Sequence, residues 1–367
     1  MEDTDQKNTV SALEQVLSVA VENGASDIHL AVGEPFLFRI GPDMIRCNVS
    51  PLTRQDVEQL IRNLLSPKQS SILSETHELD FSFQTAKIDK ARFRVNVGLE
   101  NKGLFATFRV IPNEIRDIAK LGFPDDKVWQ DIVGLNKGLV FVTGVTGSGK
   151  STTLASIIQE INARYAEKII CIEDPIEYVH QNRKSVVIQR EVGRDTQSFA
   201  AGVKWALRQD PDNILVGEIR DVETARAALT AAETGHLVLT TLHTKDAVGT
   251  IRRFVELFSS SEQNEIRASL SDNLGYVLTQ QLIPYEINAN RVLAMEVLKN
   301  NFAIANLIRE GKIHQLQGLI ETGMKEGMIT MDRHLQNLWQ AGKITRETAL
   351  YYAANRHVQE EVLALDK

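Results

Sequence analysis

The sequence predicts an α/β protein with an α+β domain first, a second domain around a mostly parallel sheet, and a small helical region at the carboxyl end. Three observations support this prediction. Apolar and polar residues alternate in segments between 81 and 111, as in half-buried antiparallel strands. From about residue 128, strand and helix patterns follow one another, which is typical of a parallel α/β sheet. After about residue 300 only helical spacing remains.

The first domain is predicted to span residues 1–111 and to contain two helices and several strands. Helical apolar spacing covers residues 10–22 and again 51–65, where Thr53 is the expected N-cap. The expected strands are 28–40, interrupted at 33–35, then 81–83, 91–97 and 104–111. Residues 112–127 hold two prolines and several charges, which predicts a linker.

The second domain, residues 128–299, is the predicted parallel α/β unit. Its expected strands are 139–143, 169–172, 185–188, 214–216 and 237–241. The carboxyl-terminal region, 300–367, is expected to form a small helical bundle, with helices at 302–309, 313–321, 331–340 and 346–354.

The composition is that of a globular protein of the cytoplasm. Of the 367 residues 43% are hydrophobic and 24% charged, and the formal net charge is −7. No long basic run occurs, so a nucleic-acid partner has no electrostatic support. Cys47 and Cys171 are the only cysteines, which suits a reducing compartment. The acidic amino end lacks the features of a secretory signal, and no apolar run approaches the ~20 residues of a membrane-spanning helix.

Residues 144–151 match the phosphate-binding pattern G-x-x-x-x-G-K-[S/T] in full. The motif follows a predicted strand and precedes a predicted helix, the context in which backbone N–H groups and the helix dipole hold a polyphosphate. Lys150 is expected to reach the β- and γ-phosphates, and the Ser151 hydroxyl to bind Mg²⁺. The expected nucleotide-binding residues are Gly144, Val145, Thr146, Gly147, Ser148, Gly149, Lys150, Ser151 and Thr152. The sequence therefore predicts binding of a nucleoside triphosphate.

Carboxylates follow two of the other predicted strands. Glu173, Asp174 and Glu177 come after the strand at 169–172, where an α/β fold binds its ligand, although a solvated turn is the alternative. Glu218 follows the strand at 214–216, and a carboxylate at that point binds Mg²⁺ or positions water in P-loop ATPases. Gly217 stands where such enzymes usually have aspartate, so we expect Glu218 to act as general base or water-orienting residue.

His236 and His243 flank the predicted strand at 237–241. They are seven positions apart, so in a regular strand they face opposite sides. No cysteine or carboxylate cluster completes a metal site. A structural role is one interpretation. Because the phosphate loop belongs to the same predicted sheet, we favour sensing of the γ-phosphate.

Arginines alternate with apolar residues on the predicted strands of the first domain. Arg92 and Arg94 fall on one face while Phe93 packs inward, and Arg109 lies on the next strand. One interpretation is an exposed basic face. The other is an arginine finger donated to the nucleotide of a neighbouring subunit.

Taken together, four segments resemble the type II/type IV secretion ATPase superfamily. They correspond to its Walker A, Asp box, atypical Walker B and His box, at residues 144–151, 172–177, 215–221 and 234–243. Within that superfamily, residues 24–30, 189–196 and 303–310 look like motifs of the PilT branch, the twitching-motility retraction ATPases. The resemblance covers the chain from about residue 16 to 350.

This resemblance implies a PAS-like first domain, a RecA-like P-loop ATPase core and a homohexameric ring that binds ATP and Mg²⁺. Glu218 would polarise the attacking water, and Arg94 and Arg109 would approach the phosphates. Glu173, Glu177, His236 and His243 would line the site, with Glu173 a further candidate to bind Mg²⁺.

The same resemblance implies a motor at the cytoplasmic face of the inner membrane. It would drive pilus retraction through an inner-membrane platform protein and reach the membrane through that partner only. A paralogous retraction ATPase is a second candidate partner.

Two absences favour the retraction branch over assembly or secretion ATPases. The two cysteines cannot build the four-cysteine zinc module of those relatives, and no additional amino-terminal domain is expected. Two features differ from the PilT pattern. Ala305 replaces an arginine of the carboxyl-terminal helix motif, and residues 324–342 resemble PilU, the accessory paralogue. The alternatives are therefore a PilU-like accessory, a secretion or assembly ATPase, a RecA-type nucleic-acid motor and a non-hydrolysing nucleotide-binding ring.

Overall fold

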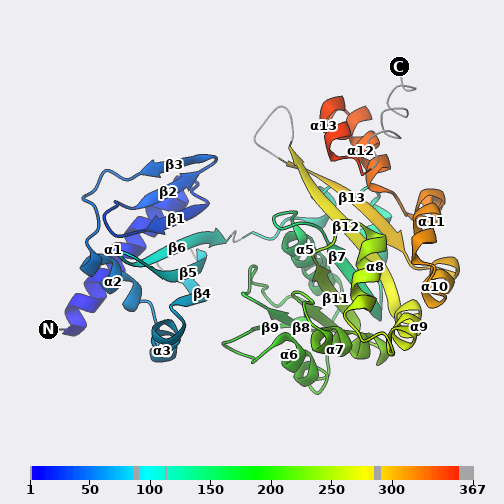
Figure 1. Ribbon diagram of the computed structural model, residues 1–367, viewed down its shortest axis with the longest axis horizontal. Helices are drawn as coiled ribbons and strands as arrows, with labels where there is room; N and C mark the ends of the chain where they lie inside the picture. Colours follow the sequence, from blue (N-terminus) through cyan, green and yellow to red (C-terminus); the bar gives the residue numbers. More distant parts are fainter. Residues whose placement is uncertain (1, 86–90, 112–113, 285–290, 355–367) are drawn as a thin grey trace. The chain divides into compact units, whose positions relative to one another are not determined.

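The computed structural model describes residues 2–85, 91–111, 114–284 and 291–354 (Figure 1). The chain divides into two compact units, Met1–Glu114 and Ile115–Lys367. Each unit has its own sheet, one of six strands and one of seven. The predicted α/β fold class is confirmed.

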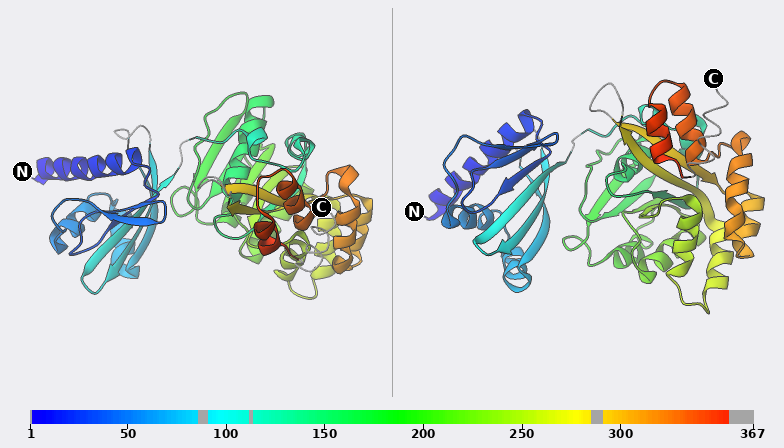
Figure 2. Two further views of the ribbon diagram at one scale, coloured as in Figure 1. Left: turned by 90° about the horizontal axis from the view of Figure 1, so that it is seen from above. Right: turned by 45° about the horizontal axis from the view of Figure 1, so that its top comes forward.

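The first unit is an antiparallel sheet covered on one face by helices (Figures 1 and 2). Its strand order is β3-β2-β1-β6-β5-β4. Along β5, Phe93, Val95 and Val97 are buried under α1 and α2, whereas Arg94 and Asn96 lie on the opposite, polar face. The elements are α1 (Glu2–Glu22), β1 (Asp27–Leu30), β2 (Leu37–Ile40), β3 (Asp43–Arg46), α2 (Arg54–Arg62), α3 (Pro67–Thr76), β4 (Glu78–Gln84), β5 (Arg92–Glu100) and β6 (Gly103–Ile111).

Local capping explains both helices that come after β3. Thr53 is the N-cap of α2, as predicted, and forms a capping box with Asp56. Helix α3 was not predicted, although Ser66 and Gln69 form a second capping box with Pro67 at the first helical position. This serine, proline and glutamine spacing is a helix start signal, but few apolar residues come after it.

The second unit has a seven-stranded sheet in the order β13-β12-β7-β11-β10-β8-β9. Its strands are parallel except for β13, which pairs antiparallel with β12. The strands are β7 (Gly138–Thr143), β8 (Lys168–Glu173), β9 (Val186–Glu191), β10 (Asn213–Val216), β11 (Leu237–Leu242), β12 (Leu274–Pro284) and β13 (Arg291–Lys299). The helices are η1 (Ile118–Lys120), α4 (Asp126–Val133), α5 (Lys150–Arg164), α6 (Phe199–Ala206), α7 (Val222–Glu233), α8 (Ala247–Glu256), α9 (Gln263–Asn273), α10 (Phe302–Arg309), η2 (Ile313–Gln315), α11 (Leu316–Thr322), η3 (Met324–Glu326), α12 (Met331–Gln340) and α13 (Arg346–Tyr352).

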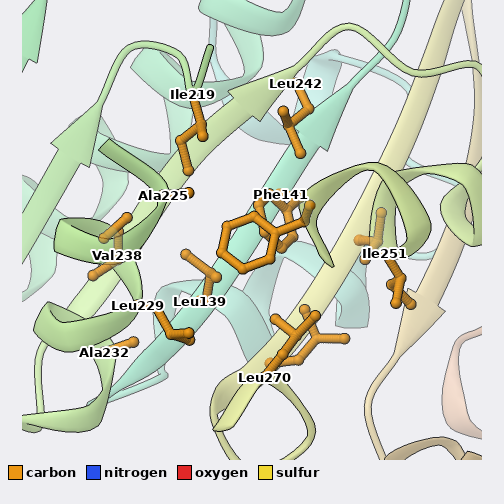
Figure 3. Packing of buried hydrophobic residues seen from close by; sticks show 14 of the residues in the cluster. Leu139, Phe141, Ile219, Ala225, Leu229, Ala232, Val238, Leu242, Ile251 and Leu270 are labelled. Atoms are coloured by element: carbon orange, nitrogen blue, oxygen red, sulfur yellow. The ribbon is translucent and has the colours of Figure 1, made fainter. Parts of the chain in front are cut away.

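Strand β7 is buried on both faces because helices cover each side of the sheet. Leu139 and Phe141 pack with α6, α7, α8 and α9, as Figure 3 shows for α7, α8 and α9. Val140 and Val142 pack instead with α4 and α5. An uninterrupted apolar strand of this kind is what a parallel sheet covered on both faces requires.

The second unit is larger than the predicted core. Ile118 and Trp129 belong to its apolar interior, so residues from 115 onward fold with this unit and not as a linker. Strands β12 and β13 were not among the predicted strands. The described helices between residues 300 and 354 do not form a separate bundle, because α10 and α11 pack on the main core and α12 and α13 pack on β12 and β13. The described residues contain no helix with the length and apolarity that a membrane crossing needs.

We predict that Phe141→Ala lowers the free energy of unfolding by about 3–5 kcal/mol, since it removes a fully buried ring that packs edge-on against Phe254. Urea denaturation measures the loss. Phe302→Ala removes the same ring where it is 83% exposed and should change stability by about 0.5 kcal/mol or less. Equal losses in the two variants would contradict the assigned core.

Candidate nucleotide-binding site

The phosphate loop connects the end of β7 to the start of α5. Thr143 ends the strand and Lys150 begins the helix, so the loop is residues 144–149. Gly144 has φ of 140°, and a β-carbon there would lie 2.3 Å from the backbone oxygen of Gln280 and 2.6 Å from Ser148 Oγ. Only glycine fits at this position, because the loop passes directly against the neighbouring strand β12.

Lys150 lies folded over this loop. Its Nζ donates hydrogen bonds to the backbone oxygens of Gly144 (2.9 Å) and Val145 (3.1 Å). Burial lowers the pKa of the ammonium, an effect that the carboxylates of Glu218 and Glu177 oppose. The lysine and both acidic residues therefore lie within electrostatic reach of one another.

Glu218 stands two residues after β10 and is held by two basic side chains. Its Oε2 lies 2.8 Å from Arg220 Nε and 3.5 Å from His243 Nε2, and its side chain is only 12% exposed. Gly217 precedes it, where a β-carbon would lie 3.3 Å from both the Ile172 oxygen and the Phe199 ring. A larger side chain at 217 would therefore need its neighbours to shift by a few tenths of an ångström.

The acidic segment after β8 lies beside the first turn of α5. Glu173 ends the strand, and its Oε1 accepts a hydrogen bond from Gln189 Nε2 at 2.9 Å. Five residues on, the Tyr178 hydroxyl lies 2.8 Å from Thr152 Oγ1. Ser151 is the second residue of α5 and is half-buried. The loop that follows β8 thus contacts the first turn of α5.

The two histidines lie at opposite ends of β11, which differs from the expectation that both line one nucleotide site. His243 follows β11 and reaches Glu218, at the edge that carries the phosphate loop. His236 precedes β11, about 20 Å away along a six-residue strand. Its Nδ1 lies 2.9 Å from the Ala231 oxygen, a bond in which the ring nitrogen donates and caps α7. His236 does not line the nucleotide site of its own subunit.

Arg94 and Arg109 face each other across β5 and β6 in the first unit. Arg109 Nε lies 2.8 Å from Asp27 Oδ1, and Arg94 Nη2 lies 3.5 Å from Asp80 Oδ2. Burial would raise the pKa of Asp27, but hydrogen bonds from Arg109 and Ser26 hold it below its usual value. The proximity of these arginines to a nucleotide stays a prediction.

Two residues of the site were not singled out from the sequence. Arg220 is two residues after Glu218 in the motif at 215–221, and that proximity in sequence could have marked it as a residue of the site. Gln280 lies on β12, a strand that was not predicted, and its Nε2 donates to the Ser148 oxygen at 2.8 Å. No sequence motif marks this glutamine.

Comparison with known proteins gives a consistent result. The chain matches the family model described as type II/IV secretion system protein over residues 2–361. It is 45% identical over 335 residues to the type IV pilus retraction ATPase PilT of Pseudomonas aeruginosa, which covers 91% of this chain and 96% of that protein. The type IV pilus ATPase PilU of the same organism is 36% identical over 340 residues, covering 93% of this chain and 88% of that protein. A crystal structure of the pilus retraction motor PilT with bound ADP has a TM-score of 0.87 at 44% identity, over 95% of this chain and 98% of that chain.

The positions of the histidines predict different effects of their removal. His243→Ala should lower kcat for triphosphate hydrolysis roughly tenfold or more, because it removes a neighbour of Glu218. His236→Ala should keep kcat and lower stability by about 1 kcal/mol, since only the cap of α7 is lost. Phosphate release and thermal melting of both variants test this. A catalytic loss confined to His236→Ala would contradict the placement.

Proposed function

Because this chain belongs to the type II/IV secretion system protein family, we propose that it is a type IV pilus retraction ATPase of the PilT type. Its enzymatic class is ATPase, and the reaction is hydrolysis of ATP to ADP and phosphate. The proposal rests mainly on the similarity to the retraction ATPase PilT, which extends over nearly the full length of both chains. The intact phosphate loop and Glu218 supply the residues that hydrolysis needs.

In this proposal the phosphates of ATP bind at the loop between β7 and α5. Lys150 exchanges its hydrogen bonds with the loop carbonyls for contacts with the β- and γ-phosphates. The amino end of α5 adds its backbone N–H groups and dipole. The binding energy comes mainly from charge and backbone geometry.

Glu218 polarises the water that attacks the γ-phosphorus. The new bond joins the water oxygen to phosphorus, and the bond from phosphorus to the bridging β–γ oxygen breaks. Because Arg220 and His243 both contact Oε2, the other carboxylate oxygen is directed toward the water. His243 is also within reach of the phosphate side of the sheet and is the candidate γ-phosphate sensor.

The residues at the loop fit Mg²⁺. Oxygen atoms are the ligands that this ion prefers, and Ser151 at the start of α5 and Glu173 at the end of β8 supply a hydroxyl and a carboxylate. When bound, Mg²⁺ would supply positive charge that offsets the negative charge developing on the phosphate during hydrolysis. Ser151 would hold the ion directly, while Glu173 would act through water or as a second ligand.

The motor is proposed to be a homohexameric ring whose nucleotide sites are completed by neighbouring subunits. Arg94 and Arg109 are the candidate contributions from the first unit. They are paired in register across β5 and β6. Each forms an ion pair with an aspartate, and a phosphate would replace that aspartate as the partner of the guanidinium. An inner-membrane platform protein would receive the motion and release pilins from the pilus base.

The PilU-like accessory role is the second candidate function. It is favoured by residues 324–342 and by Ala305, and such a chain would act beside a paralogous retraction ATPase. The lower identity to PilU than to PilT favours the main motor role. Either role places the protein in the pilus machinery at the cytoplasmic face of the inner membrane.

We predict that Glu218→Gln keeps ATP affinity within a few-fold and lowers kcat at least ~100-fold, because the amide retains shape but does not polarise water as a carboxylate does. Lys150→Ala is the matched comparison and should weaken binding as well. In a deletion strain, the Glu218→Gln allele should leave excess surface pili and no twitching. Absent pili would point to assembly, and unchanged hydrolysis would exclude the assigned mechanism.

Mixed rings test donation between subunits. Arg94→Ala and Glu218→Gln proteins should each be inactive alone, whereas mixed rings should recover part of the wild-type rate, since some sites then receive an intact arginine and an intact glutamate. Phosphate release at several mixing ratios measures this. A rate that stays at zero at every ratio, with rings formed, would refute the shared site.

A further inference from the structure

Gln280 on β12 lies directly beneath the phosphate loop and is fully buried. Its Nε2 donates to the Ser148 oxygen at 2.8 Å. Its backbone oxygen is the atom that a β-carbon on Gly144 would strike, and its Nε2 would lie 3.3 Å from a β-carbon on Gly149. This one residue thus adjoins the beginning and the end of the loop.

The amide of Gln280 is only half satisfied. The acceptor at Ser148 is a carbonyl, so the amide nitrogen must face it, and Oε1 points elsewhere. Within the described residues this buried Oε1 has no hydrogen-bond partner, and neither does the buried hydroxyl of Ser148. A buried polar atom without a partner destabilises a fold, so Oε1 offsets part of the stability that the hydrogen bond from Nε2 contributes.

The neighbouring residues show that the strand does not depend on this amide. Thr143 and Thr279 already join β7 to β12 through hydroxyls 2.8 Å apart. Backbone pairing continues from Leu274 to Thr279 along the same two strands. The hydrogen bond from Gln280 therefore stabilises the position of the loop and is not needed for the pairing of β7 with β12.

We propose that Gln280 is a positioning residue of the nucleotide site, which holds residues 144–149 in the conformation that accepts phosphates. This rests on the proposed function, because it takes the loop to be the ATP site. Without the amide, the loop keeps its sequence and its lysine but samples other conformations. Nucleotide affinity falls in proportion to the population that is lost.

The test compares Gln280→Met with Gln281→Met in the full-length protein. Methionine matches glutamine in length, and Gln281 lies on the opposite face of β12, away from the loop. Fluorescent ADP binding and KM for ATP measure the site, and thermal melting without nucleotide measures the fold. We expect roughly tenfold weaker binding for Gln280→Met only, with a melting temperature close to that of the wild type, because losing the bond to Ser148 and removing the partnerless Oε1 have opposite effects on stability.

A structural role would give the reverse pattern, a lower melting temperature with unchanged affinity, and would overturn the proposal. So would equal affinities in the two methionine variants. If Gln280→Met does not fold, Gln280→Leu decides by the same two measurements, because it removes the donor to the Ser148 oxygen without burying a charge. A wild-type protein that binds no nucleotide would refute the proposed function instead of the role of Gln280.

Discussion

The parallel register of β7, β11, β10 and β8 is the constraint on which the site depends. Thr143 is paired with Leu242, and Val216 with both Thr240 and Ile172. The carboxyl ends of all four strands therefore lie at the same edge of the sheet. The phosphate loop, His243, Glu218 and Glu173 are all at that edge. The register of the backbone hydrogen bonds is enough to place these groups at one edge, without direct contacts between all of them.

A second constraint is the lack of space beneath that edge. Gly144 and Gly217 each stand where a β-carbon would crowd a backbone oxygen of a neighbouring strand. The phosphate loop and the turn after β10 can therefore pass close to the neighbouring strands. The functional side chains come from residues near the two glycines, Lys150 and Glu218. Arg220 and His243 then converge on one oxygen of Glu218, so a single carboxylate is oriented by two separate elements.

Much of this could be predicted from the sequence, because short motifs determine local geometry. The strand, loop and helix around Lys150 and the position of Glu218 after a buried strand depend on residues close together in the chain. The failures concern long-range placement. The sequence predicts that His236 and His243 flank one strand, but the expectation that both line the nucleotide site overlooks that only one end of that strand adjoins the phosphate loop. Gln280 could not be found, because its role depends on β12 adjoining β7, a pairing of segments more than 130 residues apart.

The pairing of β12 with β13 gives the loop a mechanical connection to the end of the chain. Gln280 is in register with Met295, whose N–H donates to His334 Nδ1 on α12 at 2.9 Å. Burial lowers the pKa of His334 to about 4, so the ring stays neutral and keeps this bond at physiological pH. Helix α12 and the phosphate loop are thus joined by a continuous series of backbone and amide hydrogen bonds. A helix far along the chain and the nucleotide site therefore belong to one hydrogen-bonded network.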